Sequence, residues 1–397
     1  MAASPARRAA FNVVRRVLER DAYADRALHG EARGLDARDR ALAKRLAFGA
    51  VQWRGTLDWI IGRHVDRRLD PKVRAALHIG LYQLLHTEVP AHAAVAEAVE
   101  LAKPSPGARL VNAVLRKVQR EGVELPDDSD PAGAAIRHAH PEWLVRMWWD
   151  WLGAEETRAL LAANNRPAEL ALRINPLVDA DAGDLPGRRV EGDPDALVVD
   201  GPLDVFNHPL YAAGAIIPQS RASQRVARIV DPQPGERILD LCAAPGGKAT
   251  HMAALTGNRA EIVAVEAHPG RADALRRQCE RMRADSVRVH VADARRLTAD
   301  ELGGRFDRIL VDAPCSGLGT LSGHPDLRWR ASPESIEELR TLQEEIVAAA
   351  TGLLRPGGRL VYSVCTLSPR EEVVGGEVTR TWPHRDDTDG FYIARDG

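Results

Sequence analysis

The chain has 397 residues, of which 45% are hydrophobic and 28% are charged. This balance is typical of a globular protein with two or three domains. No apolar run reaches the roughly 18 residues of a membrane span, and the arginine-rich start lacks the apolar core of a secretory signal. The four cysteines form no Cys-x-x-Cys pair, which disfavours a zinc site or disulfide framework. We therefore expect a cytoplasmic protein without a membrane partner.

The net charge of −2 conceals an uneven distribution along the chain. Residues 1–125 hold 22 Lys and Arg against 14 Asp and Glu, whereas the remainder holds 32 against 42. A basic module on an acidic body indicates an anionic partner for that module. Ordinary solvent-exposed helix surfaces would give the same counts, so the charge distribution alone does not show that this module binds an anionic partner.

Residues 1–125 are predicted to form an all-helical bundle. Apolar residues recur at helical spacing throughout this stretch, and short links join the helices. Helix breakers lie at Asp70-Pro71, at Val89-Pro90 and at Lys103 to Gly107. The polar, proline-containing stretch from Leu125 to Gly133 is interpreted as a linker.

Tryptophans cluster in the helix predicted after Pro141, at Trp148, Trp149 and Trp151. Such rings could stack on bases, but at helical spacing core packing is the better interpretation. Residues 171–175 are predicted to form a strand. Residues 177–205 are rich in Gly, Pro and Asp and are predicted to be a loop.

From about residue 235 onwards, apolar strands alternate with helical segments. The predicted strands are Arg237–Cys242, Ile262–Ala267, Val287–Ala292, Phe306–Asp312 and Gly358–Cys365. A long helix is expected over Pro333–Leu354. This alternation predicts an α/β domain with a doubly wound, mostly parallel sheet. Ligands of such sheets bind beyond the carboxyl ends of the strands.

The turn after the first of these strands, Asp240 to Lys248, ends in a glycine pair that lets the backbone approach a ligand. It is neither a P-loop, which would need glycine in place of Cys242, nor a dinucleotide fingerprint. The next two strands end in Glu266 and Asp293, which suit a ribose diol and an adenine edge. Singly, each carboxylate is better explained as a cap or surface residue. Together, with no arginine expected opposite, they favour a cationic, phosphate-free cofactor such as S-adenosylmethionine.

The fourth strand ends in Asp312-Ala313-Pro314-Cys315 and the fifth in Cys365. Amine methyltransferases carry Asp/Asn-Pro-Pro-aromatic at the end of the fourth strand. Cys315 in this motif therefore indicates a different chemistry. A thiolate that adds to carbon 6 of cytosine makes carbon 5 nucleophilic; a carboxylate and a base complete the reaction. A lone cysteine is usually a core residue, and we assign Cys279 to helix core on that ground. The strand-end positions of the other two favour a catalytic pair.

In the segments Asp240 to Lys248, Asp312 to Gly317 and Cys365-Thr366, the sequence resembles the RNA cytosine-5 methyltransferases. Among these it is similar to the bacterial members that act on 16S ribosomal RNA, over nearly the whole chain. The resemblance implies a NusB-like RNA-binding bundle at residues 1–125 and an RNA-contacting linking subdomain at 126–232. It implies a Rossmann-like S-adenosylmethionine-dependent methyltransferase domain at 233–397.

The resemblance also implies roles for single residues. Cys365 would attack the base, Cys315 would assist proton removal and product release, Asp312 would contact the base, and Lys248 would lie near the crevice. One departure is the absence of asparagine after Glu371-Glu372, where the family usually has Pro-Glu-Glu-Asn. The predicted donor-binding residues are Cys242, Ala243, Ala244, Pro245, Gly246, Gly247, Lys248, Glu266, Asp293 and Asp312.

Two other functions compete with methylation of 16S ribosomal RNA at cytosine carbon 5. One is a transfer RNA cytosine-5 methyltransferase. The other is a non-catalytic RNA-binding factor in ribosome assembly or antitermination. The donor loop and both cysteines favour an enzyme, because a protein that had lost catalysis would usually lack one of them. We expect the protein to be a monomer.

Overall fold

The computed structural model describes residues 3–201 and 203–396. Two compact units divide the chain between them. One contains the chain up to Pro167 together with Leu321–Arg330, and the other contains Ala168–Thr320 and the chain from Ala331 onwards. The first division falls inside the stretch 126–232 that the sequence assigns to one linking subdomain, and the domain boundaries given there stay a prediction.

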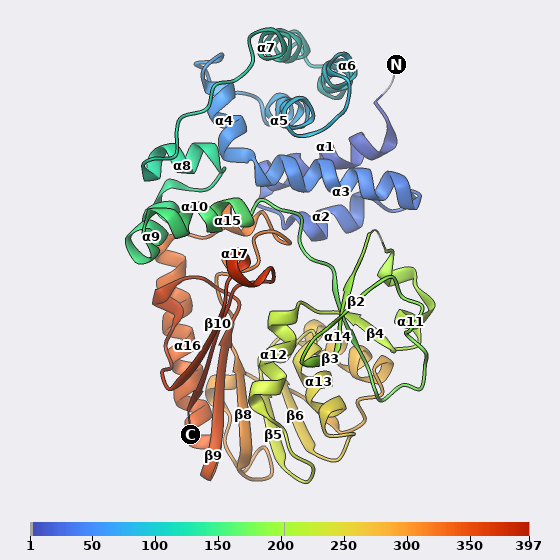
Figure 1. Cartoon of the computed structure of the whole chain (residues 1–397), viewed down its shortest axis with the longest axis vertical. Helices are drawn as coiled ribbons and strands as arrows, with labels where there is room; N and C mark the ends of the chain where they lie inside the picture. Colours follow the sequence, from blue (N-terminus) through green and yellow to red (C-terminus); the bar gives the residue numbers. More distant parts are fainter. Residues whose placement is uncertain (1–2, 202, 397) are drawn as a thin grey trace. The chain divides into compact units, whose positions relative to one another are not determined.

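The first unit begins as the predicted all-helical bundle, drawn in blue to teal in Figure 1. The breaks at Asp70-Pro71 and Val89-Pro90 are confirmed, since each immediately precedes a helix. The Asp70 carboxylate caps its helix by accepting a hydrogen bond from the Lys72 N–H at 2.8 Å. The helices are α1 (Pro5–Arg20), α2 (Ala24–Glu31), α3 (Ala37–Gln52), α4 (Arg54–Gly62), α5 (Pro71–His86), α6 (Ala91–Ala102) and α7 (Ala108–Glu121).

Three further helices, α8 (Pro131–Arg137), α9 (Glu142–Leu152) and α10 (Ala154–Ala163), belong to the same unit. Trp148 on α9 is fully buried, which confirms core packing for this tryptophan. The short helix α15 (Leu327–Arg330) also lies in this unit, although the chain reaches it after Cys315. Its Arg328 is fully buried and donates hydrogen bonds to the Ala139 and Asn164 carbonyls at 3.2 and 3.1 Å.

The second unit contains a small antiparallel sheet in the order β2-β3-β1-β4. The predicted strand at 171–175 is confirmed as β1, but the loop predicted at 177–205 is wrong, because β2 and β3 lie there. The Gly, Pro and Asp content of this stretch predicts a loop, but pairing with β1 stabilises β3 as a strand. Leu197 pairs with Leu172, and both are buried. The strands are β1 (Ala171–Ile174), β2 (Gly187–Val190), β3 (Asp193–Val199) and β4 (Ile216–Pro218).

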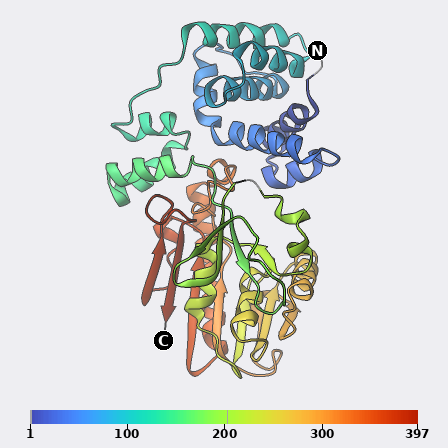
Figure 2. The same ribbon diagram turned by 45° about the vertical axis from the view of Figure 1, so that its right-hand side comes forward.

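The large sheet has seven strands in the order β10-β11-β9-β8-β5-β6-β7. Strands β5 to β9 are mutually parallel and β11 runs antiparallel to its neighbours, which confirms the doubly wound, mostly parallel prediction. In Figure 2, β10 and β11 lie in dark red at one edge of this sheet. The strands are β5 (Arg237–Leu241), β6 (Glu261–Glu266), β7 (Val287–Val291), β8 (Phe306–Asp312), β9 (Leu354–Val364), β10 (Glu377–Thr381) and β11 (Phe391–Asp396).

Helices pack on the large sheet and connect its strands. The predicted helix over 333–354 is confirmed as α16, which begins with a capping box at Ser332. Cys279 is buried on α14, as predicted for a core cysteine. The helices of this unit are α11 (Pro209–Ala212), α12 (Arg221–Val230), α13 (Gly247–Leu255), α14 (Pro269–Arg281), α16 (Pro333–Leu353) and α17 (Pro383–Asp386).

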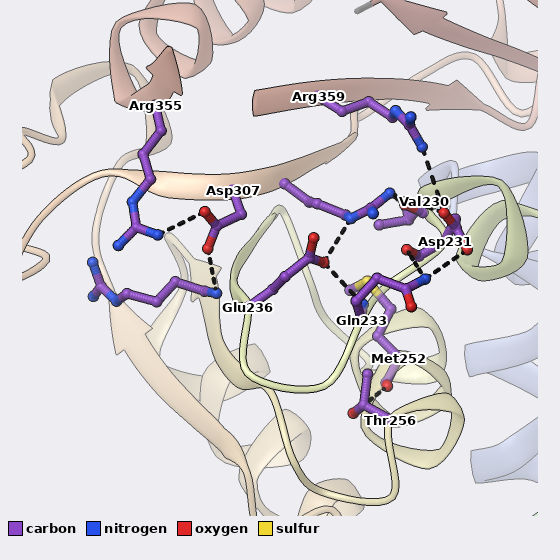
Figure 3. A network of polar contacts seen from close by, with 11 residues as sticks. Val230, Asp231, Gln233, Glu236, Met252, Thr256, Asp307, Arg355 and Arg359 are labelled. Atoms are coloured by element: carbon purple, nitrogen blue, oxygen red, sulfur yellow. Dashed lines mark hydrogen bonds and ion pairs between the residues drawn. The ribbon is translucent and has the colours of Figure 1, made fainter. Parts of the chain in front are cut away.

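Charged pairs fasten the chain near the amino ends of β5, β8 and β9 (Figure 3). Arg308 Nε donates to Glu236 Oε2 at 2.6 Å, and Arg355 donates to Asp307 Oδ1 at the same distance. Arg359 lies 3.6 Å from Asp231. None of these residues is a predicted site residue. The pairs therefore stabilise the amino ends of the strands, whereas the predicted site lies at the carboxyl ends.

Candidate active site

The two predicted catalytic cysteines come together at the carboxyl ends of neighbouring strands. β8 and β9 pair in parallel with Asp312 opposite Ser363, so the segments that follow them leave the sheet side by side. Cys315 and Cys365 are both free and partly exposed, and their Sγ atoms lie 3.4 Å apart. That distance allows the thiol of one residue to donate a hydrogen bond to the sulfur of the other.

The surroundings make the two sulfur atoms unequal. The pKa of Cys315 is raised well above its usual value by the hydrogen bond with Cys365, by burial and by the negative charges of Cys365 and Glu371. Cys315 therefore keeps its proton at neutral pH. A neutral thiol at that position can donate to a thiolate at Cys365 and can exchange a proton in the crevice.

Asp312 and Lys248 form an ion pair beside the cysteines. Lys248 Nζ donates to Asp312 Oδ2 at 2.6 Å, while the Ser363 hydroxyl donates to Asp312 Oδ1 at 3.1 Å. The same Nζ lies 5.4 Å from the centre of the Phe391 ring. Burial lowers the pKa of Lys248, but the charge and hydrogen bond of Asp312 outweigh that effect and raise the pKa overall. The lysine is thus a fixed cation close to both cysteine loops.

Asp240, at the end of β5, is fully buried, and neither of its carboxyl oxygens has a hydrogen-bond partner among the described residues. Burial first, and then the charge of Asp312, raises the pKa of Asp240 well above its ordinary value, against the opposing effect of Lys248. An unpartnered buried carboxyl group is costly, so its presence beside the donor loop indicates a polar or cationic ligand there.

The predicted donor loop, Cys242 to Lys248, connects β5 to α13. Cys242 has a φ of 63°, and burial raises the pKa of its thiol to about 12, so its backbone rather than its sulfur shapes the turn. Gly246 has a φ of 104°, and a Cβ there would lie 2.6 Å from a Leu275 methyl group. Glycine is therefore required, and the first N–H groups of α13 point toward the space beyond the strands.

Glu266 and Asp293 follow in order at the ends of the neighbouring strands β6 and β7, as the sequence predicts. Glu266 accepts a hydrogen bond from the His268 N–H at 2.9 Å and lies 3.3 Å from Arg271. Asp293 accepts hydrogen bonds from Arg295, which lower the pKa of Asp293 to about 2.

The expectation that no arginine lies opposite these acids is therefore wrong. Arg271 lies near the start of α14 and Arg295 in the 3₁₀ turn after β7, which an inspection of strand ends alone does not reach. The two arginine side chains are 57% and 41% exposed, whereas the Glu266 side chain is only 4% exposed.

Arg173 is a site-positioning residue that the sequence analysis missed. It is fully buried on β1 and donates to the Gly247 carbonyl at 2.9 Å and to the Thr250 hydroxyl at 2.8 Å. The small sheet thereby holds the first turn of α13, which carries Lys248. The sequence did hold a signal for this role, because an arginine inside an apolar strand such as β1 needs a buried polar partner.

Within the described ranges, no cluster of three or more His, Cys, Asp or Glu side chains is arranged to hold a metal ion. No helix in those ranges is both long and apolar enough to cross a membrane. Carboxylates at successive strand ends and a glycine loop instead fit a cationic nucleoside donor. Fold and site define an S-adenosylmethionine-dependent methyltransferase.

Comparison with known families supports this class and narrows it. Residues 227–377 match the model of the 16S rRNA methyltransferase RsmB/F family, residues 4–120 match the NusB family, and residues 140–182 match the RsmF/B-like ferredoxin-like domain. Ribosomal RNA small subunit methyltransferase B of Vibrio vulnificus is 35% identical, over 98% of both chains. That of Pseudomonas putida is 35% identical over 94% of this chain and 89% of its own. The chain belongs to the ribosomal RNA small subunit methyltransferase B family.

Solved structures share the architecture. The crystal structure of PH0851 covers 100% of this chain with a TM-score of 0.83 and 27% identity, over 99% of its own length. NSun6 from Pyrococcus horikoshii, solved with SFG, has a TM-score of 0.58 and 22% identity over 65% of this chain and 98% of its own, which shows a shared fold.

Replacing Asp240 by asparagine should change how stability depends on pH. The folded-state pKa of Asp240 lies above its unfolded value of 3.8, so wild-type stability falls as pH rises between those two values. Asparagine does not titrate. The stability of Asp240→Asn relative to wild type should therefore rise as the pH increases above about 4, by at most roughly 1.4 kcal/mol per pH unit. Denaturant unfolding at several pH values measures this difference; a constant difference would contradict the assignment.

Proposed function

We propose that the protein methylates carbon 5 of a cytosine in 16S ribosomal RNA through a covalent bond between Cys365 and carbon 6 of the base. The observation that carries the proposal is the pair of sulfur atoms 3.4 Å apart beside the Lys248–Asp312 ion pair. An amine or hydroxyl acceptor would need neither thiol. An aromatic carbon needs a nucleophile to activate it and a base to finish the reaction.

Each polar group has a task in this reaction. Cys365 as thiolate adds to carbon 6, while Asp312 contacts the base at ring nitrogen 3 and supports the addition. S-adenosylmethionine supplies an electrophilic methyl group to carbon 5. The Cys315 thiol then passes its proton to the departing Cys365 sulfur, 3.4 Å away, and takes the carbon 5 proton in its place as the Cys365–carbon 6 bond breaks. Lys248 holds Asp312 in place and balances the negative charge of the crevice.

The donor is proposed to bind against the loop Cys242 to Lys248, with Glu266 at the ribose and Asp293 at the adenine edge. Asp312 borders both donor and base. Asp240 lies beneath this loop with two free acceptor atoms. The preference for a sulfonium cation over a phosphate-bearing ligand rests on Asp240, because Glu266 and Asp293 are already paired with arginines.

The choice of 16S ribosomal RNA rests on the relatives' names and on the basic, NusB-matching helical unit. Transfer RNA is the nearest alternative substrate. A non-catalytic assembly role is less well supported, because it gives no reason for two thiols in contact beside an ion pair. We further propose that the enzyme acts as a cytoplasmic monomer.

Cys365→Ala should abolish methyl transfer, with a loss of at least about a thousandfold, because no other described thiol occupies its place. No denaturant-resistant complex with RNA should form. Labelled donor with 16S RNA measures transfer, and denaturing electrophoresis measures the complex. The matched control is Cys279→Ala, whose sulfur is buried on α14 and which should stay active. Full activity in Cys365→Ala would disprove the mechanism.

Cys315→Ala should leave the attacking thiol intact but block release. Turnover should fall by about a hundredfold or more, the range expected when an acid–base group is removed. The same gel should now show a protein–RNA complex that survives denaturant and requires Cys365. If Cys315→Ala turns over normally and accumulates no complex, a group other than Cys315 removes the carbon 5 proton.

The basic face of α7 should contribute to RNA affinity. Arg109, Arg116, Lys117 and Arg120 are all exposed there. Changing the four to glutamine should flatten the dependence of log K on log salt by roughly 0.7–0.9 for each RNA phosphate that the protein no longer neutralises. Binding titrations between low and moderate salt give the slope. An unchanged slope would mean that these charges are a solvated surface only.

A further inference from the structure

A buried carboxylate, Glu371, lies directly behind the two cysteines. Its side chain is fully buried and comes from the 3₁₀ turn Pro369–Glu371. Glu371 Oε1 accepts a hydrogen bond from the Ser316 N–H at 2.9 Å. Glu371 Oε2 accepts from the Ser316 hydroxyl at 2.5 Å and from the Thr366 hydroxyl at 3.0 Å. Because Ser316 follows Cys315 and Thr366 follows Cys365, one carboxylate binds the residue after each cysteine.

Two further side chains hold this carboxylate in place. Gln343 on α16 donates to Glu371 Oε1 at 3.1 Å and to the Pro314 carbonyl, beside Cys315, at 2.8 Å. The buried Tyr362 on β9 donates its hydroxyl to the Glu371 backbone carbonyl at 2.8 Å. A buried charge is stable only when hydrogen bonds satisfy it, and the carboxylate here accepts four, two of them from Ser316.

The two cysteine loops also contact each other directly. The Ser316 and Thr366 hydroxyl oxygens lie 2.6 Å apart, and the Gly319 N–H donates to the Cys365 carbonyl at 3.0 Å. A Cβ on Gly319 would lie only 3.0 Å from that carbonyl oxygen, so the backbones are close there. Glu371 and these contacts together fix the spacing of the loops.

We propose that Glu371 is a positioning residue: its carboxylate joins the Cys315 and Cys365 loops and sets the distance between the two sulfur atoms. The geometric part rests on the hydrogen bonds that Glu371 accepts from Ser316 and Thr366. The catalytic consequence, that nucleophile and proton acceptor stay within reach of one base, rests on the proposed function.

The charge of Glu371 adds an asymmetry to this geometry. Four ionisable side chains besides the cysteines surround the pair: Lys248 and Asp312, which form the ion pair, and Glu371 and Tyr362 behind. Lys248 interacts with Cys365, whereas Glu371 adds to the effects that raise the pKa of Cys315. The anion behind Cys315 favours the protonated thiol at that residue.

The test uses the full chain without RNA or donor, so it does not depend on methyl transfer. Phenylarsine oxide, a trivalent arsenical that bridges two neighbouring thiols, reports the spacing of the sulfur atoms. Iodoacetamide labelling followed by peptide mass spectrometry reports the reactivity of each thiol separately. Loss of arsenical binding in Cys365→Ser calibrates the first probe.

Glu371→Ala should weaken arsenical binding about tenfold, because the sulfur atoms are no longer preorganised. Glu371→Gln is nearly isosteric and should largely restore arsenical binding, yet should raise the alkylation rate of Cys315 several-fold because the charge is gone. The matched control is Glu372→Gln, whose carboxylate pairs with Arg380 and which should change neither readout. If Glu371→Ala does not fold, the double variant Ser316→Ala with Thr366→Val removes the hydroxyl groups that Glu371 binds.

Unchanged arsenical binding in Glu371→Ala, or in the double variant if Glu371→Ala does not fold, would overturn the positioning role, and so would equal effects in Glu372→Gln. Methylation assays then separate this proposal from the proposed function. If Glu371→Ala lowers kcat while KM for the donor is unchanged, and Glu371→Gln restores part of kcat, both stand. If wild-type protein fails to methylate cytosine, the thiol measurements still decide the role of Glu371.

Discussion

The parallel pairing of β8 with β9 is the contact on which the site depends. Asp312 lies opposite Ser363, so both strands end at the same level and their loops leave the sheet together. A shift of one residue would send alternate side chains to the other face of the sheet and would separate the two sulfur atoms. Ladder hydrogen bonds and the buried apolar residues of both strands oppose such a shift. The chemistry is thus fixed by the most regular part of the fold.

Around that pairing the protein concentrates buried charge, which a stable core would avoid. Lys248 with Asp312 and Glu371 with its hydrogen-bond donors are satisfied, but Asp240 is not. An unpartnered buried carboxyl group of this kind weakens the free protein and strengthens binding of a complementary ligand. The uneven distribution of charge also gives the two thiols, 3.4 Å apart, different surroundings.

Two elements outside the large sheet are linked to its loops, one by hydrogen bonds and one through the chain itself. Arg173, on the small sheet, fastens the start of α13 behind the donor loop. After the Cys315 loop, the chain continues at once into Leu321–Arg330, which belongs to the helical unit and is fixed there by the buried Arg328. The unit that contains the NusB-matching residues is therefore joined in sequence to the segment that carries Cys315.

The sequence by itself determined the alternation of strands and helices, the mostly parallel sheet and the strand-end positions of Cys315, Cys365, Asp312 and Glu266. These features follow from local periodicity and from the rule that parallel strands present their carboxyl ends at one edge. Only the tertiary structure decided the 3.4 Å sulfur contact, the Lys248–Asp312 pair and the burial of Asp240. It also replaced the predicted loop at 177–205 by two strands, and it revealed Arg173, Arg271, Arg295 and Glu371 as partners of the site. Each of these depends on groups that meet in space from distant positions or around a turn, and such hydrogen-bond and charge partners leave no periodic trace in the sequence.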